Sequence, residues 1–158
     1  MKVVHGTCSF DIGGTQKQII YLCREGNRKG FHHETVEIFP EHNYLYRTEE
    51  KVIPEQYVQG CLLAKALGFL TRSPSTRSWQ VVQVYKFFCD FQRLKPDIVV
   101  GWGHEIAMLA FISATLAQVP HIYFCIRNYN PRYGWTGNGK FFRFAHGIMW
   151  PFLTGLIC

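Results

Sequence analysis

The second half of this sequence is poor in acidic residues. After Glu105 there is no aspartate or glutamate, whereas Arg127, Arg132, Lys140 and Arg143 follow, and the 158 residues carry a net charge of +6. A basic face of this kind favours an anionic partner such as a phosphate, an acidic lipid surface or nucleic acid. The alternative is a basic surface balanced by an acidic segment that lies outside this sequence.

Paired cysteine motifs and long apolar runs are also missing. None of the six cysteines forms Cys-x-x-Cys, which predicts buried, reduced thiols rather than a disulfide framework. The N-terminus MKVVHGTCSF lacks the apolar region of a signal peptide. The longest apolar run, IAMLAFISATLA, is shorter than the roughly 20 residues that span a bilayer, so we expect a buried helix there. These absences predict a cytoplasmic protein.

What the sequence does contain is an alternation of strand-like and helix-like segments. With 47% hydrophobic residues, the chain can build one domain with a proper core. A helix over 15–30 is expected to end at Gly30, and the first half of 79–95 has a strand as its competing interpretation. We expect strands at 2–10, 33–39, 96–103 and 120–126, helices at 15–30, 55–70, 79–95, 104–118 and 141–158, and loops at 71–78 and 127–140.

The expected strands are continuous apolar runs, which indicates a parallel sheet covered by helices on both faces. The sequence therefore predicts a Rossmann-like α/β fold. Ligands of such sheets bind beyond the carboxyl ends of the strands. Three segments are expected at that edge: Gly13-Gly14, the stretch 101–104 with the sequence GWGH, and Arg127-Asn128.

The glycine pair lies in the stretch SFDIGGTQKQII, residues 9–20. Glycine lets backbone amides approach a ligand closely, and a helix that starts after the turn directs its free N–H groups and positive dipole end at the same point. This pattern suits a phosphate, although a tight turn without ligand is equally compatible with it. A sugar kinase is another interpretation, in which Asp11, Gly13, Gly14 and Thr15 bind ATP within a hairpin. A strand over 15–29 would favour the kinase, and a helix would disfavour it.

The order of the motifs resembles a known family. The matching stretches are VVHGTCSFDIGGTQKQIIYLCREGNRKGFHHETVEIF and RLKPDIVVGWGHEIAMLAFISATLAQVPHIYFCIRN. They are similar to the N-terminal domain of family-4 glycosyltransferases of the GT-B fold, with a first strand, a Gly-Gly turn, a helix that ends in glycine, a Lys-Pro-Asp-Ile-Val strand and a Val-Pro strand. The resemblance covers most of the chain except roughly 41–80 and the tail.

This resemblance implies that residues 1–158 are a single acceptor-side domain, and that a second, donor-binding domain lies outside this sequence. The full protein would transfer a sugar from a nucleoside diphosphate sugar to a glycan or lipid-linked acceptor with retention of configuration. It would be a bacterial enzyme that builds a surface glycan, and the present chain alone would be inactive. Gly13, Gly14, Thr15 and Gln16 would face the donor diphosphate. No metal and no cofactor beyond the nucleotide sugar are expected.

Other residues near the expected edge are candidates for acceptor binding. Trp102 would stack on a sugar, with a buried core tryptophan as the alternative, and Glu105 would bind acceptor hydroxyls. Many relatives carry a histidine after the Val-Pro strand, where this sequence reads CIRNYNP. Acceptor-binding candidates are Trp102, His104, Glu105, Arg127, Asn128 and Arg132; among them His104 and Arg127 are the catalytic candidates.

The remaining histidines and the aromatic loop carry weaker signals. His5 is expected to be a core histidine with satisfied hydrogen bonds, and the neighbours His32 and His33 have no spaced metal partner, so zinc is not expected. The loop at 127–140 mixes aromatic and basic residues, which suits a sugar or an anionic membrane surface better than nucleic acid. A non-catalytic nucleotide-binding or interaction domain is a further interpretation of the whole chain.

Overall fold

The computed structural model describes residues 1–8, 14–38, 76–125, 147 and 150–157. The helix expected at 55–70 and the loop at 127–140 therefore lie outside the described residues. The strands are β1 (Lys2–Thr7), β2 (His32–Glu37), β3 (Ile98–Trp102), β4 (His121–Cys125) and β5 (Gly155–Ile157); the helices are α1 (Gly14–Arg28), α4 (Thr76–Leu94), α5 (His104–Leu116) and the 3-10 turn η1 (Trp150–Phe152).

The described strands form one five-stranded sheet in the order β2-β1-β3-β4-β5. Every neighbouring pair is parallel, with Val3 beside His33 in β2 and beside Ile98 in β3. The prediction of a Rossmann-like α/β fold is confirmed. The strand order changes direction between β1 and β3, and this is the point at which open parallel sheets bind their ligands.

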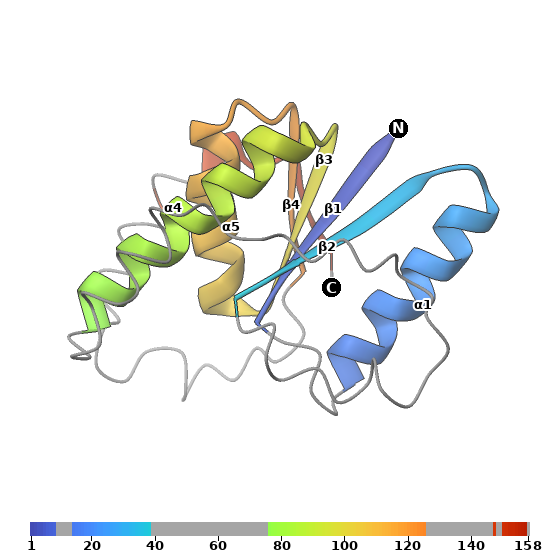
Figure 1. The fold of residues 1–158 in the computed structure, drawn as a ribbon, viewed down its shortest axis with the longest axis horizontal. Helices are drawn as coiled ribbons and strands as arrows, with labels where there is room; N and C mark the ends of the chain where they lie inside the picture. The colour runs from blue at the N-terminus through green and yellow to red at the C-terminus, as the bar shows by residue number, and fades with distance from the viewer. Residues whose placement is uncertain (9–13, 39–75, 126–146, 148–149, 158) are drawn as a thin grey trace.

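Helices cover both faces of the sheet, as Figure 1 shows with α1 on one side and α4 and α5 on the other. The α1 side is the smaller apolar cluster, in which Ile19 and Cys23 of the helix meet Val100 and Trp102 of β3. The larger cluster lies under α4 and α5, with Phe87 at its centre. Side chains alternate between these two clusters along each strand, because successive strand residues point to opposite faces.

Helix α1 ends at a glycine, as the sequence predicts. Gly30 has a φ of +83°, a left-handed conformation that glycine adopts without penalty. The amide of Phe31 donates to the carbonyl of Gly26 at 3.0 Å, and the amide of Gly30 donates to the carbonyl of Asn27 at 3.1 Å. These two bonds form the Schellman motif, which satisfies carbonyls left open at the end of a helix.

The two connections from helix to strand on the other face, α4 to β3 and α5 to β4, have the same backbone pattern. Lys95 after α4 has a φ of 47° and Gln118 after α5 has a φ of 58°, and each is followed within two residues by a proline that cannot continue a helix. Asp97 then joins β3 to β1, because its carboxylate accepts the Lys2 amide at 2.7 Å and its own amide donates to the Lys2 carbonyl at 2.9 Å. The Lys-Pro-Asp motif is therefore structural and lies at the amino edge of the sheet.

The helix expected at 79–95 is confirmed, and it begins earlier than expected, at Thr76, so the strand alternative for its first half is excluded. Two other expectations about secondary structure are wrong. The last three residues of the loop expected at 71–78 belong to α4. The helix expected over 141–158 does not continue to the end of the sequence, because Gly147 is helical but η1 and β5 follow it. Pro151 removes a helical hydrogen bond, and β4 offers an open edge with which β5 pairs.

The described cysteines form no disulfide bonds. They are Cys8, Cys23, Cys89 and Cys125, and of these Cys23 and Cys125 are buried. The prediction of reduced thiols is confirmed for these four residues. None of the helices among the described residues has the length and apolar character needed to cross a membrane.

Candidate functional site

The strand order places two helix starts at one edge of the sheet. Strand β1 ends at Thr7 and β3 ends at Trp102, and these neighbouring strands pair with Gly6 beside Gly101. Because the strands are parallel, α1 and α5 both begin at the carboxyl edge, on opposite faces of the switch point (Figure 1). We refer to this region, from the ends of β1 and β3 to the first turns of α1 and α5, as the carboxyl-edge site.

The first turn of α1 is open to a ligand. Gly14 is exposed and Thr15 and Gln16 are half-buried. The first turn contains no acidic side chain that would offset the positive end of the helix dipole. A Cβ at Gly14 would meet no atom within 4 Å, so the described residues leave room for a side chain at this position.

Helix α1 also separates two of the interpretations left open by the sequence. The kinase interpretation requires a second strand after the glycine pair, and residues 14–28 are instead one continuous helix. A hairpin that cradles ATP cannot form from a helix, so the structure disfavours the kinase. The same helix agrees with the arrangement expected of the glycosyltransferase family.

The start of α5 is formed without a side-chain cap. Gly103 is the N-cap residue, with a φ of 78° that favours glycine, and no side chain caps the first turn. Gly101 permits the close approach of α5, because a Cβ there would lie 2.6 Å from the Cα of Ala107. The first turn of α5 therefore faces the same edge, and its N-cap residue supplies no side-chain bond to the amides.

Several predicted site residues cannot be compared with the structure. Gly13, Arg127, Asn128 and Arg132 lie outside the described residues. The backbone of residues 104 and 105 opens α5 at the carboxyl edge; their side chains are not described. The structure thus brings Gly14–Gln16 and the start of α5 to one edge, as the sequence predicts.

Trp102 is the predicted site residue with the clearest position. Its side chain is 4% exposed and packs in the cluster beneath α1. The indole Nε1–H donates a hydrogen bond to Nδ1 of His5 at 3.0 Å. The structure therefore supports the alternative of a buried tryptophan over stacking on a sugar ring.

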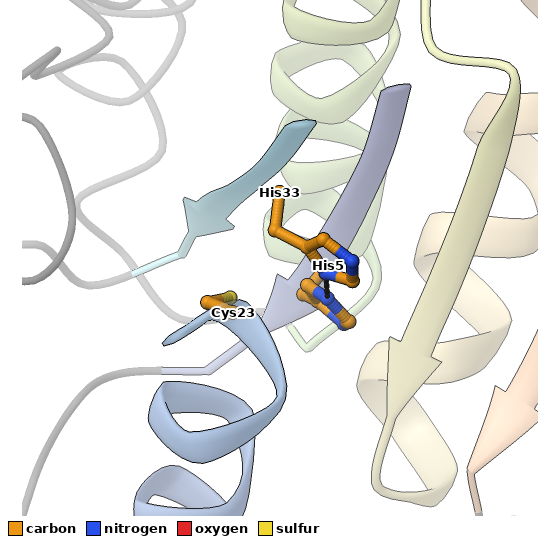
Figure 2. Close-up of side chains that lie close together, drawn as sticks. All are labelled: His5, Cys23 and His33. Atoms are coloured by element: carbon orange, nitrogen blue, oxygen red, sulfur yellow. Dashed lines mark hydrogen bonds between the residues drawn. The ribbon is translucent and has the colours of Figure 1, made fainter. Parts of the chain in front are cut away.

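His5 continues this hydrogen bonding toward the edge strand β2. Its side chain is 2% exposed, and its Nε2 lies 2.9 Å from Nδ1 of His33, which is half-buried (Figure 2). The two rings stack with centroids 5.2 Å apart. The expectation of a core histidine with satisfied hydrogen bonds is confirmed for His5.

The chemistry of tryptophan determines which atom donates and which accepts in these two hydrogen bonds. An indole N–H can only donate, so Nδ1 of His5 is an acceptor and carries no proton. A neutral His5 then carries its proton on Nε2 and donates it to Nδ1 of His33. Neutral His33 must carry its own proton on Nε2. We call this arrangement the Trp102–His5–His33 chain.

Burial keeps both histidines uncharged. It lowers the pKa of His5 to about 3, with a smaller contribution from the neighbouring His33. Burial also lowers the pKa of His33, and the charge of His32 lowers it further. A charged imidazole is disfavoured in this cluster because it would lose its hydration without gaining a carboxylate partner.

Cys23 of α1 lies beside the two rings, and the three possible ligand atoms all fall within 4.8 Å of one another (Figure 2). Two imidazoles and a thiolate are ligands that zinc accepts. However, a metal on Nε2 of His5 would move the ring proton to Nδ1, where it would face the indole N–H of Trp102. Burial also raises the pKa of the Cys23 thiol to about 12. The donor and acceptor roles in the Trp102–His5–His33 chain therefore favour a hydrogen-bonded histidine pair over a bound metal ion.

Sequence reasoning missed this cluster because its members are distant in the chain. His33 comes next to β1 only through the parallel pairing of β1 and β2. Its imidazole also packs directly on α1 at Gly26, where a Cβ would overlap the ring nitrogen Nε2. A histidine pair in adjacent strands and a glycine inside a helix were the signals in the sequence that could have indicated it.

Comparisons with known proteins give no relatives for this chain. No protein-family model matches it, and no curated protein matches its sequence.

Proposed function

We propose that this chain is the acceptor-side domain of a retaining GT-B glycosyltransferase, which transfers a sugar from a nucleoside diphosphate sugar to a glycan or lipid-linked acceptor. The observation that carries the proposal is the start of α1 at Gly14, the first described element after β1, at the switch point of a parallel sheet. The order of motifs in the sequence supports the same family.

The role proposed for the carboxyl-edge site is to neutralise the leaving diphosphate without a metal. The free amides of Gly14, Thr15 and Gln16 would donate to the phosphate oxygens, and the dipole of α1 would favour their negative charge. The uncapped first turn of α5 would add a second set of donors, with His104 and Glu105 oriented toward the acceptor. A cytoplasmic location at the inner face of a membrane, where the lipid-linked acceptor lies, is part of this proposal.

The diphosphate site is tested by a matched pair of substitutions at Gly14. Asparagine and aspartate have nearly the same shape, and the Cβ that both would place at this position meets no atom within 4 Å. Uridine and guanosine diphosphates are titrated into the ¹⁵N-labelled natural protein that contains these residues, while the amide shifts of Gly14–Gln16 are followed by NMR. We expect saturable shifts in the native chain and in Gly14→Asn, and their loss in Gly14→Asp because the added charge repels the phosphates.

Three outcomes of the titration would contradict the proposal. The first is the absence of saturable shifts in Gly14–Gln16. The second is equal binding by both variants. The third is a preference for magnesium-bound ATP over the diphosphates, which would restore the kinase.

Sugar transfer is tested separately on the natural protein that contains these residues. Incubation with nucleoside diphosphate sugars and a lipid-linked acceptor should give a product with the anomeric configuration of the donor. Binding of the diphosphate without any turnover would instead support the non-catalytic nucleotide-binding domain.

A further inference from the structure

The Trp102–His5–His33 chain has a property that its two hydrogen bonds impose. It contains two contacts between nitrogen atoms, at 3.0 Å and 2.9 Å, and each contact needs one proton. The indole supplies the first and Nε2 of His5 supplies the second. The remaining proton is on Nε2 of His33, outside both contacts.

An additional proton cannot enter this chain without breaking it. The only unprotonated nitrogens are Nδ1 of His5 and Nδ1 of His33, and each is the acceptor of one of the two bonds. Protonation of either atom places two N–H groups face to face, either between the two rings or, if the His5 proton moves to Nδ1, between His5 and Trp102. Because a buried donor without an acceptor is costly, one of the two contacts must then open.

His33 is the end at which a proton enters. His5 is almost fully buried, whereas His33 is half-buried on the edge strand β2 and its ring can turn toward water. Its ring packs on Gly26, and its backbone amide donates to Oδ1 of Asn27 at 2.9 Å. Movement of His33 therefore acts on the last turn of α1 as well as on His5.

We propose that the Trp102–His5–His33 chain is an acid-sensitive latch. Protonation of His33 breaks its bond to His5, loosens the last turn of α1 and β2 from β1, and removes the restraint on Trp102 at the carboxyl end of β3. The latch is closed when both rings are neutral. This property does not depend on the proposed glycosyltransferase function.

Within the part of the chain that the structure describes, the groups around His33 contribute no opposing negative charge at close range. From β1 it faces His5, from α1 it faces the neutral thiol of Cys23, and within β2 it adjoins His32. The nearest carboxylate along the strand belongs to Glu34, which points to the opposite face. There Glu34 is paired with Lys2 at 2.8 Å and with His32 at 2.7 Å.

Glu25 and Arg28, which flank Gly26 on α1, form an exposed ion pair with each other at 2.8 Å. Burial and the neighbouring charge of His32 both lower the pKa of His33, so the latch is expected to open below the ordinary histidine range of about 6.5.

The test follows the ring nitrogens and the indole in one NMR titration of the full ¹⁵N-labelled chain, from neutral pH to about two units below the ordinary histidine pKa. At neutral pH both His5 and His33 should carry their proton on Nε2. On acidification the His33 ring and the indole N–H of Trp102 should shift with a common midpoint, while the amides of α5 stay unchanged. The indole signal is assigned with Trp102→Phe.

Two matched variants separate the latch from general effects of acid. Glutamine at position 33 offers an oxygen that accepts from His5 and does not titrate, so His33→Gln should hold the Trp102 signal constant over the same pH range. His32→Gln, at the adjacent exposed position, should keep the transition and move its midpoint to higher pH, because one positive neighbour is gone.

Four outcomes would overturn the proposal: a proton on Nδ1 of either ring at neutral pH, titration of His33 without a shift of Trp102, the same Trp102 transition in His33→Gln, or stoichiometric displacement of the ring signals by added Zn²⁺. The first, second and fourth are read on the native chain, so the test stands even if His33→Gln fails to fold.

Discussion

The contact between α1 and His33 leads to a prediction about Gly26. Gly26 lies inside the helix and has no positive φ, so alanine is allowed there by the backbone. A Cβ at this position would nevertheless overlap Nε2 of His33 and lie 2.8 Å from its Cε1. The change Gly26→Ala therefore sets a helix-favouring residue against a steric conflict with one side chain.

The two effects have opposite signs and different sizes. Alanine in place of glycine stabilises a helix interior by about 1 kcal/mol. Overpacking costs about 1–3 kcal/mol. If the His33 ring turns away instead, the buried Nε2–H of His5 loses its acceptor, at a cost of about 1–3 kcal/mol. The cost of overpacking or of the lost hydrogen bond equals or exceeds the gain in helix propensity. We therefore expect Gly26→Ala to lower the free energy of unfolding by up to about 2 kcal/mol.

The assay is urea unfolding of four chains: the native protein, Gly26→Ala, His33→Ala and the double variant. With His33 reduced to alanine the conflict is absent, so Gly26→Ala should then stabilise by up to about 1 kcal/mol. The coupling energy between the two positions should be about 1–3 kcal/mol. An equal effect of Gly26→Ala in both backgrounds would refute the packing of His33 against α1.

Four further predictions concern other described positions. Gly101→Ala should destabilise by about 1–3 kcal/mol in thermal unfolding, because its Cβ would meet the backbone of Ala107 at 2.6 Å; an unchanged melting temperature would contradict the close approach of α5. Gly30→Ala should cost about 1 kcal/mol in urea unfolding because of the φ of +83°, and Gly30→Asn should cost less; equal costs would contradict the left-handed cap. Burial raises the pKa of Asp90 to about 6 from an ordinary 3.8, so the folded state binds more protons than the unfolded state between these values, and the stability linked to Asp90 falls as pH rises. Replacing it by asparagine should therefore stabilise the folded state more at neutral pH than at pH 4, by about 2 kcal/mol. A difference that does not change with pH would contradict the burial. The pKa of His5 is lowered to about 3, and this acts in the opposite direction, because the unfolded state binds the extra proton. The free energy of unfolding should therefore fall as pH falls from about 6.5 toward 3, with a slope of up to about 1.4 kcal/mol per pH unit. A comparison of the native chain with His5→Gln, which lacks this titration, measures the effect.

The strand and helix pattern was predictable because it depends on local residue types. The strands β1, β3 and β4 are short apolar runs, β2 alternates between polar and apolar residues, and prolines precede β3 and β4. The Gly30 cap follows from the end of an amphipathic helix. The C-terminal strand β5 was not predictable. It is only three residues long, and it depends on the open edge of β4, which no pattern within the tail itself reveals.

The candidate site was predictable only in part. The position of Gly14–Gln16 follows from strand, turn and helix in sequence order. The burial of Trp102 and its bond to His5 do not, because they depend on the pairing of β1 with β3 and on the side of the sheet that α1 covers. Contacts of this kind are set by tertiary packing and cannot be predicted from local patterns in a single sequence.

The strand order also determines how long one edge of β1 stays unpaired during synthesis. Strand β1 lies between β2 and β3, yet Lys2 and its partner Asp97 are 95 residues apart in the chain. At roughly 5–20 residues per second, the edge of β1 that β3 will cover stays open for about 5–20 seconds after β1 itself is made. An open, apolar strand edge can pair with another chain. Misassembly of this protein is therefore expected to begin at β1, before β3 has left the ribosome.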